Sequence, residues 1–318
     1  MGLFHCPLGA VGFGDEGCIR CGLCSAATAE RKKAAAEILR AWIREHGSSR
    51  KDIKIQKIAI CGKGGAGKST ATALLSGALA ALGYRSLIID TDNSNGGLWR
   101  KLGLSAPPLP LRSGDEPPRF LTKDPLYLSD IDESYIAVNG MRSMVLPGKI
   151  DDPLLGCACS IAAFAKTLID NIALSQNELV IADQEAGVES FGRGVEQGCD
   201  TVLILTEPSL ESIELAEKIQ YMAQGIGIQR IRALINKAED QDQVEFMQES
   251  LSARSIRCLG NLPLQKDILN RNLRGAELTP EFSYRIAGQI ARYLLDEAEM
   301  SYTCLLYTSP SPRDRQKS

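Results

Sequence analysis

Apolar runs alternate with amphipathic stretches between about residue 55 and residue 297, and this alternation predicts strands and helices in turn. Strands are expected at Lys57–Ile60, Ser86–Ile89, Met144–Leu146, Leu179–Ala182, Thr201–Leu205, Ile231–Ile235 and Ile256–Leu259. Helices are expected at Lys68–Leu82, Ile161–Ala173, Leu210–Gln224, Gln241–Ala253 and Glu281–Glu297. Strands that alternate with helices pair in parallel through right-handed crossovers. The predicted fold class is therefore α/β, with a mostly parallel sheet and helices on both of its faces.

A glycine-rich segment follows the first predicted strand and opens the first predicted helix. It fits the phosphate-loop pattern G-x-x-x-x-G-K-S/T and reads Gly62, Lys63, Gly64, Gly65, Ala66, Gly67, Lys68, Ser69 and Thr70. The glycines let backbone N–H groups turn toward an anion, and the helix N-terminus adds positive charge. We expect Lys68 to contact the β- and γ-phosphates and the Ser69 hydroxyl to hold Mg²⁺. The segment predicts a P-loop NTPase domain.

Polar side chains stand where three later strands are predicted to end: Asp92, Asp183, and the pair Asn236 and Lys237. Ligands of open α/β sheets bind at the carboxyl ends of strands. Asp92 is expected to hold the Mg²⁺ water shell or to orient the attacking water, Asp183 to hold the metal, and the Asn236 amide to pair with the adenine edge. Either acid alone also fits a helix cap or a turn, but two acids that follow one phosphate loop favour a functional role.

Charge and composition narrow the possible partners. The 318 residues carry a net charge of −3 with only 5% aromatic residues and no basic block, so no nucleic-acid partner is expected. With no secretory signal and no apolar run long enough for a bilayer, we expect a cytoplasmic protein without a membrane partner. In that compartment ten cysteines indicate metal or redox sites more than disulfides. Cys61, Cys199 and Cys258 lie beside apolar runs and are expected to be small buried hydrophobes.

The sequence predicts three regions. Residues 1–50 are expected to form a cysteine-rich module with a linker helix, and residues 51–300 the P-loop domain. Residues 301–318 resemble translated sequencing-adapter read-through and are expected to be a disordered, artefactual tail. The proline-rich stretch 106–125 is predicted to be a surface excursion, with a mobile lid as the open alternative.

Lys63 goes beyond the general phosphate-loop pattern. The run from Lys63 to Ser69 resembles the deviant Walker-A loop of a superfamily of dimerising ATPases. It includes the nitrogenase iron protein, the MinD and ParA ATPases and the CO dehydrogenase accessory ATPase. The resemblance implies an ATP-hydrolysing homodimer in which Lys63 crosses to the partner's nucleotide and stabilises transition-state charge. It also implies that Asp92 lies in the first switch and Asp183 in the second.

Cys157 and Cys159 form a C-x-C pair directly before the helix predicted at Ile161–Ala173. Two thiolates supply half of a tetrahedral metal site, and the same pair from a two-fold-related subunit supplies the other half. Thiolates suit Ni²⁺ or Zn²⁺. The alternative interpretation of the C-x-C pair is that the two cysteines are structural or form an intrachain disulfide.

The surroundings of this pair resemble the CooC-type nickel-insertion ATPases of CO dehydrogenase, over roughly residues 55–295. The resemblance rests on the C-x-C pair, on the stretch Asp183–Glu189 (D-Q-E-A-G-V-E) and on Thr206–Ser209 (T-E-P-S). It implies a metallochaperone that dimerises on ATP and hydrolyses it as nickel is delivered. CO dehydrogenase or a related nickel enzyme would be the client.

Four cysteines precede the main domain: Cys18, Cys21 and Cys24 in a C-x₂-C-x₂-C run, and Cys6 in a remote Cys-Pro pair. This arrangement resembles the bacterial ferredoxin motif for a four-iron four-sulfur cluster. A four-cysteine zinc site is the alternative.

Two other functions compete with nickel delivery. An ATP-gated iron–sulfur reductase, like the nitrogenase iron protein, is the main alternative, because the N-terminal cysteines could pass electrons to a client. A positioning or partition ATPase requires a basic DNA-binding face or a lysine-rich membrane helix. The predicted helix Glu281–Glu297 ends in acidic residues, which disfavours that function.

Overall fold

The computed structural model describes residues 56–92, 96–111, 118–148, 158–188, 191, 194–228 and 230–299, without side chains at 158–160 and 297–299. The chain divides into two compact units. One is Ile55–Leu294 and contains the sheet. The other comprises Met1–Lys54 and Leu295–Ser318, of which only residues 295–299, the end of a helix, are described. The predicted cysteine-rich module at 1–50 and the tail at 301–318 lie outside the described residues.

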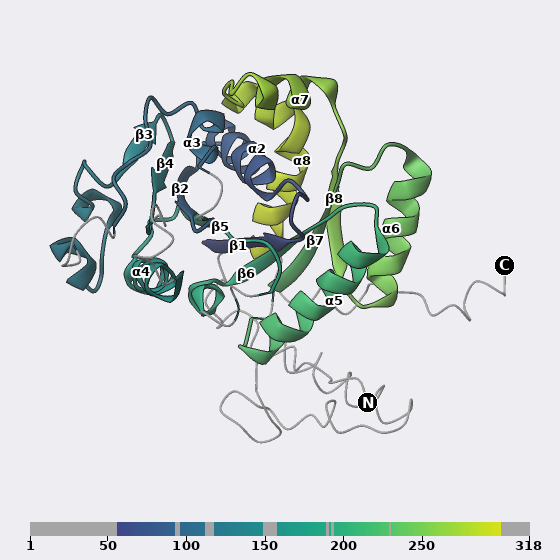
Figure 1. Cartoon of the computed structure of the whole chain (residues 1–318), viewed down its shortest axis with the longest axis horizontal. Coiled ribbons are helices and arrows are strands. Elements are labelled where there is room, and N and C mark those ends of the chain that lie inside the picture. The colour runs from purple at the N-terminus through teal and green to yellow at the C-terminus, as the bar shows by residue number, and fades with distance from the viewer. Residues whose placement is uncertain are drawn as a thin grey trace. The chain divides into compact units, whose positions relative to one another are not determined.

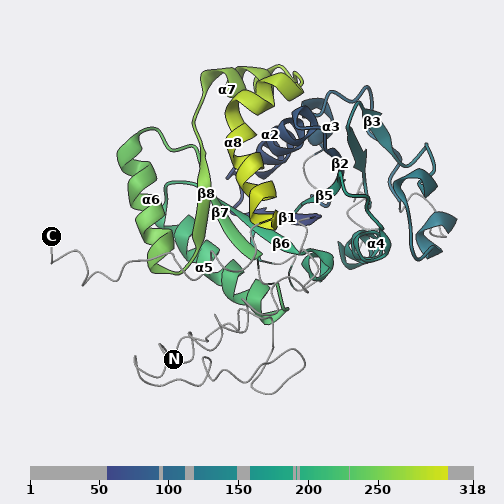
Figure 2. The same ribbon diagram turned by 180° about the vertical axis from the view of Figure 1, so that it is seen from behind.

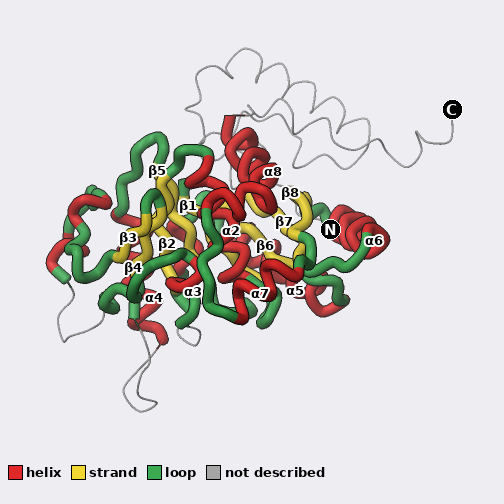
Figure 3. Tube along the Cα trace, turned by 90° about the horizontal axis from the view of Figure 1, so that it is seen from above, coloured by secondary structure: helices red, strands yellow, loops and turns green. Residues whose placement is uncertain are grey.

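Within the described residues, eight strands form one sheet in the order β3-β4-β2-β5-β1-β6-β7-β8, and Figure 3 shows them from β3 at one edge to β8 at the other. The strands are β1 (Lys57–Gly62), β2 (Arg85–Asp90), β3 (Ala137–Asn139), β4 (Arg142–Val145), β5 (Glu178–Asp183), β6 (Thr201–Thr206), β7 (Arg230–Asn236) and β8 (Arg257–Leu262). Every neighbouring pair is parallel except β3 with β4. The predicted mostly parallel α/β fold is confirmed.

Helices cover both faces of this sheet. The α-helices are α2 (Lys68–Ala81), α3 (Leu98–Lys101), α4 (Ala158–Asn171), α5 (Leu210–Gly225), α6 (Gln241–Ala253), α7 (Lys266–Leu273) and α8 (Pro280–Glu299). Short 3-10 helices are η3 (Arg119–Thr122), η4 (Leu128–Asp130) and η6 (Val195–Gly198). Figures 1 and 2 show α2, α3, α7 and α8 on one face and α4, α5 and α6 on the other.

Side chains of each central strand alternate between these two helix layers, because successive residues of a strand point to opposite faces. In β1, Ala59 and Cys61 belong to the apolar cluster that includes Ala165 of α4 and Ile213 of α5. Ile58 and Ile60, which alternate with them along the strand, are equally buried but lie outside that cluster. This double burial explains why the strands read as continuous apolar runs.

All five predicted helices are present, with α4 beginning three residues earlier than expected. Neither α3, α7 nor β3 is predicted by the hydrophobic pattern, since each is short and has few buried side chains. The described ends of the predicted surface excursion at 106–125 are mostly exposed, and Leu111, Phe120 and Leu121 anchor them in the core. Two of the three predicted buried cysteines, Cys61 and Cys199, are buried, and Cys258 is half-buried. Every described helix is too short or too polar to traverse a lipid bilayer.

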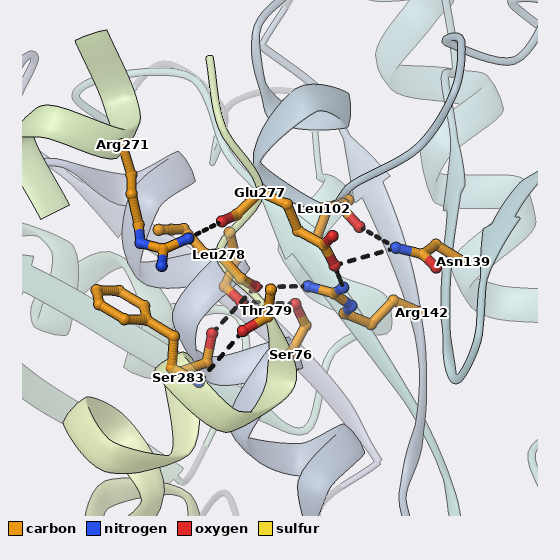
Figure 4. A network of polar contacts seen from close by, with 11 residues as sticks. Ser76, Leu102, Asn139, Arg142, Arg271, Glu277, Leu278, Thr279 and Ser283 are labelled. Atoms are coloured by element: carbon orange, nitrogen blue, oxygen red, sulfur yellow. Dashed lines mark hydrogen bonds and ion pairs between the residues drawn. The ribbon is translucent and has the colours of Figure 1, made fainter. Parts of the chain in front are cut away.

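A buried arginine links the sheet to the C-terminal helices (Figure 4). Arg142 of β4 is 1% exposed, and its two terminal nitrogens contact the Leu278 carbonyl oxygen, at 2.8 Å, and the Glu277 carboxylate. Asn139 donates to the same carboxylate (3.1 Å) and to the Leu102 carbonyl oxygen (3.0 Å). Arg271 donates to the Glu277 carbonyl oxygen at 2.9 Å. The network fixes the α7–α8 connection against β4 and against the end of α3.

Candidate nucleotide site

The phosphate loop runs from the end of β1 to the start of α2, as its sequence predicts. The loop closes on itself through the Ala66 N–H, which donates to the Lys63 carbonyl oxygen at 3.2 Å. The Thr70 and Ala71 N–H groups then donate to the Gly67 carbonyl oxygen and begin the helix. No side chain caps this helix N-terminus. Its free N–H groups and partial positive charge suit a bound phosphate.

Two glycines of this loop are required by geometry. Gly62 has a φ of +146°, and a Cβ there would lie 2.4 Å from the Leu205 carbonyl oxygen of the neighbouring strand β6. Gly67 has a φ of +95°, and a Cβ there would lie 2.6 Å from the Asn236 amide nitrogen. A side chain at either position would displace the loop or its neighbour.

Lys68 is buried at the base of the loop. Its Nζ donates to the Lys63 carbonyl oxygen at 3.2 Å and lies 3.5 Å from the Gly62 carbonyl oxygen. These carbonyl groups hold the ammonium inside the curve of the loop, where a phosphate oxygen can replace them. Its position fits the predicted role of Lys68 as a phosphate ligand.

Asp183 lies fully buried at the end of β5, next to the phosphate loop. It is the register partner of Ile60 in β1 and of Asp90 in β2. Neither carboxylate oxygen has a hydrogen-bond partner within 3.5 Å. Burial raises the pKa of Asp183 to about 6, with the Asp92 charge adding to the rise, while Ser69, Lys68 and Thr72 lower it.

Such an arrangement fits a divalent cation. A buried, unpartnered carboxylate is unfavourable by itself, and an all-oxygen set from Asp183 and Ser69 is what Mg²⁺ prefers. Asp92 is half-buried, and its N–H donates to the Asp90 carboxylate at 3.1 Å. The charge of Asp92 acts on Asp183, so the two predicted acids belong to one electrostatic group.

Lys63, the additional lysine of the deviant Walker-A loop and called the signature lysine below, lies at the mouth of the loop beside two carboxylates. Its Nζ is 3.4 Å from Oε1 of Glu207 and 3.8 Å from Oε2 of Glu211. The other oxygen of Glu207 is 3.4 Å from Nζ of Lys237. Lys237 also donates to the Gly65 carbonyl oxygen. The carboxylate of Glu207 therefore bridges two lysines that border the phosphate loop.

The loop is also held from two distant parts of the sequence. The Asn236 amide donates to the Ala66 carbonyl oxygen at 2.7 Å, and Asn272 of α7 lies 3.4 Å from the Thr70 hydroxyl. Lys237 has a φ of +62°, an uncommon value for a side-chain-bearing residue. Backbone of this kind often marks a functional position, and here it turns the Lys237 side chain back over the loop.

The predicted metal cysteines cannot be placed. Cys157 and the N-terminal set Cys6, Cys18, Cys21 and Cys24 lie outside the described residues, and Cys159 is described only as part of the backbone of α4. Among the described residues no group of three or more His, Cys, Asp or Glu side chains could hold a metal ion.

Sequence reasoning missed three side chains at this site: Glu207, Glu211 and Asn272. Glu207 directly follows β6 and meets the same strand-end criterion that selected Asp92 and Asp183. It also lies in the T-E-P-S stretch that carries part of the resemblance. Asn272 lies in a short polar helix that gave no sequence signal.

Comparisons with known proteins agree with this geometry. Residues 57–278 match the CbiA family, the CobQ/CobB/MinD/ParA nucleotide binding domain. The chain is 32% identical to an uncharacterised ATP-binding protein of Methanocaldococcus jannaschii, over 71% of this chain and 95% of that protein. It is 30% identical to the carbon monoxide dehydrogenase accessory protein CooC of Rhodospirillum rubrum, over 67% of this chain and 85% of CooC.

Solved structures show the same fold. The cell division ATPase MinD of Pyrococcus furiosus superposes with a TM-score of 0.57 at 18% identity, over 76% of this chain and 99% of that one. MinD of Pyrococcus horikoshii, solved with Mg-ADP, superposes with a TM-score of 0.56 at 17% identity, over 78% and 98%. Since the family match covers more than half of the sequence, the chain belongs to the CobQ/CobB/MinD/ParA nucleotide-binding family and is a P-loop ATPase.

Proposed function

We propose that this ATPase is a maturation factor that delivers nickel to CO dehydrogenase or a related nickel enzyme. The observation that carries the proposal is the C-x-C pair, Cys157 and Cys159, in a chain whose relative over most of its length is a CO dehydrogenase accessory protein. Nickel is the cargo in this proposal, held by thiolates between two protomers.

The fold supports a connection between these cysteines and the nucleotide. β4 runs parallel to β2, with Val145 opposite Ile89, so both strands end at the edge of the sheet where β1 leads into the phosphate loop. The chain leaves this edge after β4 and enters α4 at Ala158. Gly148 packs against Ile161, since a Cβ there would lie 2.7 Å from the Ile161 side chain. The described residues on either side of 149–157 therefore meet at this edge of the sheet, through Gly148 and Ile161.

The ATPase residues have distinct proposed roles. The backbone N–H groups of Gly62–Thr70 and the Lys68 ammonium bind and orient the phosphates. Ser69 and Asp183 hold Mg²⁺, which neutralises phosphate charge when bound. Asp92 orients the attacking water, and Asn236 with Lys237 contacts the nucleotide beside the loop. Lys63 stabilises the transition-state charge of the partner protomer, so hydrolysis requires a homodimer.

Dimerisation also completes the metal site. One protomer supplies two thiolates, and two protomers related by a two-fold axis supply four, which is a full tetrahedral set. A nucleotide that stabilises the dimer therefore stabilises the metal site, and hydrolysis weakens both. This coupling gives ATP a direct role in retaining and releasing nickel.

The test is metal binding by the full chain, purified anaerobically, with and without Mg-ATP. We expect one Ni²⁺ or Zn²⁺ per dimer, retained more tightly with ATP and lost in Cys157→Ser and Cys159→Ser. Cys258→Ser is the matched control, because Cys258 is a half-buried cysteine on β8, at the opposite edge of the sheet from β3. Metal binding that survives both C-x-C substitutions would contradict the proposal.

The four N-terminal cysteines support a second candidate, an ATP-gated iron–sulfur reductase. Cys6, Cys18, Cys21 and Cys24 are proposed to hold a four-iron four-sulfur cluster. Iron and acid-labile sulfide analysis tests the cluster, and anaerobic EPR of the reduced protein with a candidate client tests its role. ATP-gated oxidation of the cluster favours the reductase. An ATP-insensitive signal, or zinc in place of iron, favours nickel delivery.

A further inference from the structure

The signature lysine already has anionic partners within its own protomer. Lys63 faces Glu207 and Glu211, at 3.4 and 3.8 Å, and the second oxygen of Glu207 faces Lys237 at 3.4 Å. These four side chains form a charge cluster at the mouth of the phosphate loop, contributed by the loop, the end of β6, the start of α5 and the end of β7. In a dimer the Lys63 ammonium has to leave this cluster to reach an opposing phosphate.

Hydrogen bonds at the start of α5 hold the backbone that carries the two glutamates. The Glu207 N–H donates to the Ser212 hydroxyl at 3.0 Å, and Ser212 is buried in the first turn of α5. The Ser212 N–H donates in turn to the hydroxyl of Ser209, the N-cap of that helix, at 3.2 Å. Glu211 lies in the same first turn. The backbone of both acids is thus fixed relative to β6 and α5, whereas Lys63 lies on the glycine-rich loop.

We propose that Glu207, assisted by Glu211, is a positioning residue that keeps Lys63 in its own protomer until an opposing nucleotide replaces it. This inference rests on the proposed action of Lys63 across a dimer interface. The exchange is an ion-pair replacement: the ammonium leaves two carboxylates and binds phosphate oxygens, and no covalent bond changes. Glu207 retains Lys237 after the exchange, and the carboxylate of Glu211, which is 70% exposed, is then solvated by water.

The exposure of the pair suits a reversible contact. The side chains are 37% exposed for Lys63, 21% for Glu207 and 70% for Glu211, so water screens the attraction. Ion pairs of this kind are weak, and a triphosphate carries several negative charges against one on each glutamate. A triphosphate can therefore replace the two glutamates as the partner of Lys63, and without nucleotide the glutamates hold the lysine.

The first measurement is made on the nucleotide-free full chain. The acetylation rate of Lys63 by an N-hydroxysuccinimide ester is followed by mass spectrometry, with Lys218, an exposed lysine of α5, as internal reference. We expect Glu207→Gln with Glu211→Gln to raise the relative rate about three- to tenfold, the range expected for one or two partly exposed ion pairs. Glu217→Gln is the matched control, because Glu217 also lies on α5 but pairs with Arg254.

The second measurement is dimerisation with Mg-ATP, by analytical ultracentrifugation over a range of protein concentrations. The double glutamine variant is expected to dimerise at about three- to tenfold lower concentration than the parent, and Glu217→Gln at the parental concentration. In a Lys63→Ala background the glutamine substitutions are expected to have no effect, because the ion pairs are already absent.

The outcomes separate this proposal from the proposed function. An unchanged acetylation rate, or an equal dimerisation shift in the Lys63→Ala background, overturns the role of Glu207. If the parent protein stays monomeric with Mg-ATP at all concentrations, Lys63 has no opposing nucleotide to bind. That result overturns both the positioning role and the dimer on which nickel delivery depends. Loss of metal binding in Cys157→Ser alongside an unchanged acetylation rate sustains nickel delivery and overturns the positioning role.

Discussion

Arg142 in β4 and Asp183 in β5 are both charged side chains buried within one sheet, but their surroundings differ. Arg142 is 1% exposed, and both of its terminal nitrogens have oxygen partners, from Glu277 and Leu278. Asp183 is fully buried, and neither of its carboxylate oxygens has a hydrogen-bond partner within 3.5 Å.

The difference indicates that the charge of Arg142 contributes to folding, whereas the charge of Asp183 is available to bind a ligand. Arg142 connects the sheet to the α7–α8 connection, so its desolvation is offset by contacts made on folding. Lys68, Ser69 and Thr72 offset the burial of the Asp183 charge only in part, so until a cation arrives this charge destabilises the folded state. Stability and nucleotide binding are therefore expected to respond in opposite ways to substitutions in the two regions.

The largest expected effect follows from removing the carboxylate beside Arg142. Glu277→Ala leaves a buried guanidinium without a counter-charge, which is expected to lower the free energy of unfolding by about 3–5 kcal/mol. Mg-ATP affinity of the folded protein is expected to change little. Urea unfolding measures the loss, with Glu281→Gln, an exposed acid in the first turn of α8, as control. Equal, small losses in both variants would refute a folding role for the network.

Asp183→Asn is expected to stabilise the nucleotide-free protein, whereas Glu277→Ala is expected to destabilise it. The folded state holds this carboxyl group with a pKa of about 6, above the unfolded value near 3.8, so it favours the proton. Removing the charge is expected to raise the stability of the nucleotide-free protein by about 3 kcal/mol at pH 7. The gain shrinks as pH falls below 6, because the folded-state carboxyl then takes up a proton, and it becomes small near pH 3.8, the unfolded pKa. Thermal unfolding at pH 4 and 7, without Mg²⁺, checks the direction, and a destabilised variant at pH 7 contradicts it.

The same group sets the pH dependence of metal-nucleotide binding. Protonation of Asp183 removes the charge that Mg²⁺ needs, so Mg-ATP affinity is expected to fall up to about tenfold for each pH unit below 6. Titration calorimetry with a slowly hydrolysed ATP analogue between pH 5 and 7.5 measures the slope. Asp183→Asn serves as the control and is expected to bind weakly at every pH. The same steep slope in that variant would assign the proton to another group.

A smaller effect is expected where a neutral side chain supports the loop. Asn236→Ala removes the hydrogen bond to the Ala66 carbonyl oxygen, and the net value of such a bond is about 1 kcal/mol. Mg-ATP affinity is expected to fall about fivefold with little change in stability. Asn171→Ala is the matched control, because it removes an amide–carbonyl bond to Leu121, in η3. Equal affinity in the two variants would show that Asn236 does not support nucleotide binding.

Much of the fold could be predicted from the sequence, because each central strand is covered on both faces and therefore reads as an apolar run. The phosphate loop could be predicted because Gly62 and Gly67 have backbone and space requirements that only glycine meets without strain. Asp183 and Asn236 were found because each directly follows an apolar run, and parallel strands end at one edge.

The contacts of Lys63 could not be predicted in this way. Its pairing with Glu207 depends on β6 lying next to β1, and alternation of strands and helices does not specify the order of strands in the sheet. Asn272 reaches Thr70 across 202 residues, from a helix whose one buried side chain is Ile268. Local pattern carries no information about either contact.

The order in which the chain is synthesised gives these long-range contacts a further meaning. The phosphate loop leaves the ribosome early, but Asn236 and Asn272 follow 170 and 202 residues after the groups they contact. Nascent chains that lack these segments have the complete glycine-rich motif without two of its supports. Tight nucleotide binding is thus expected only after the segments that carry Asn236 and Asn272 have been synthesised.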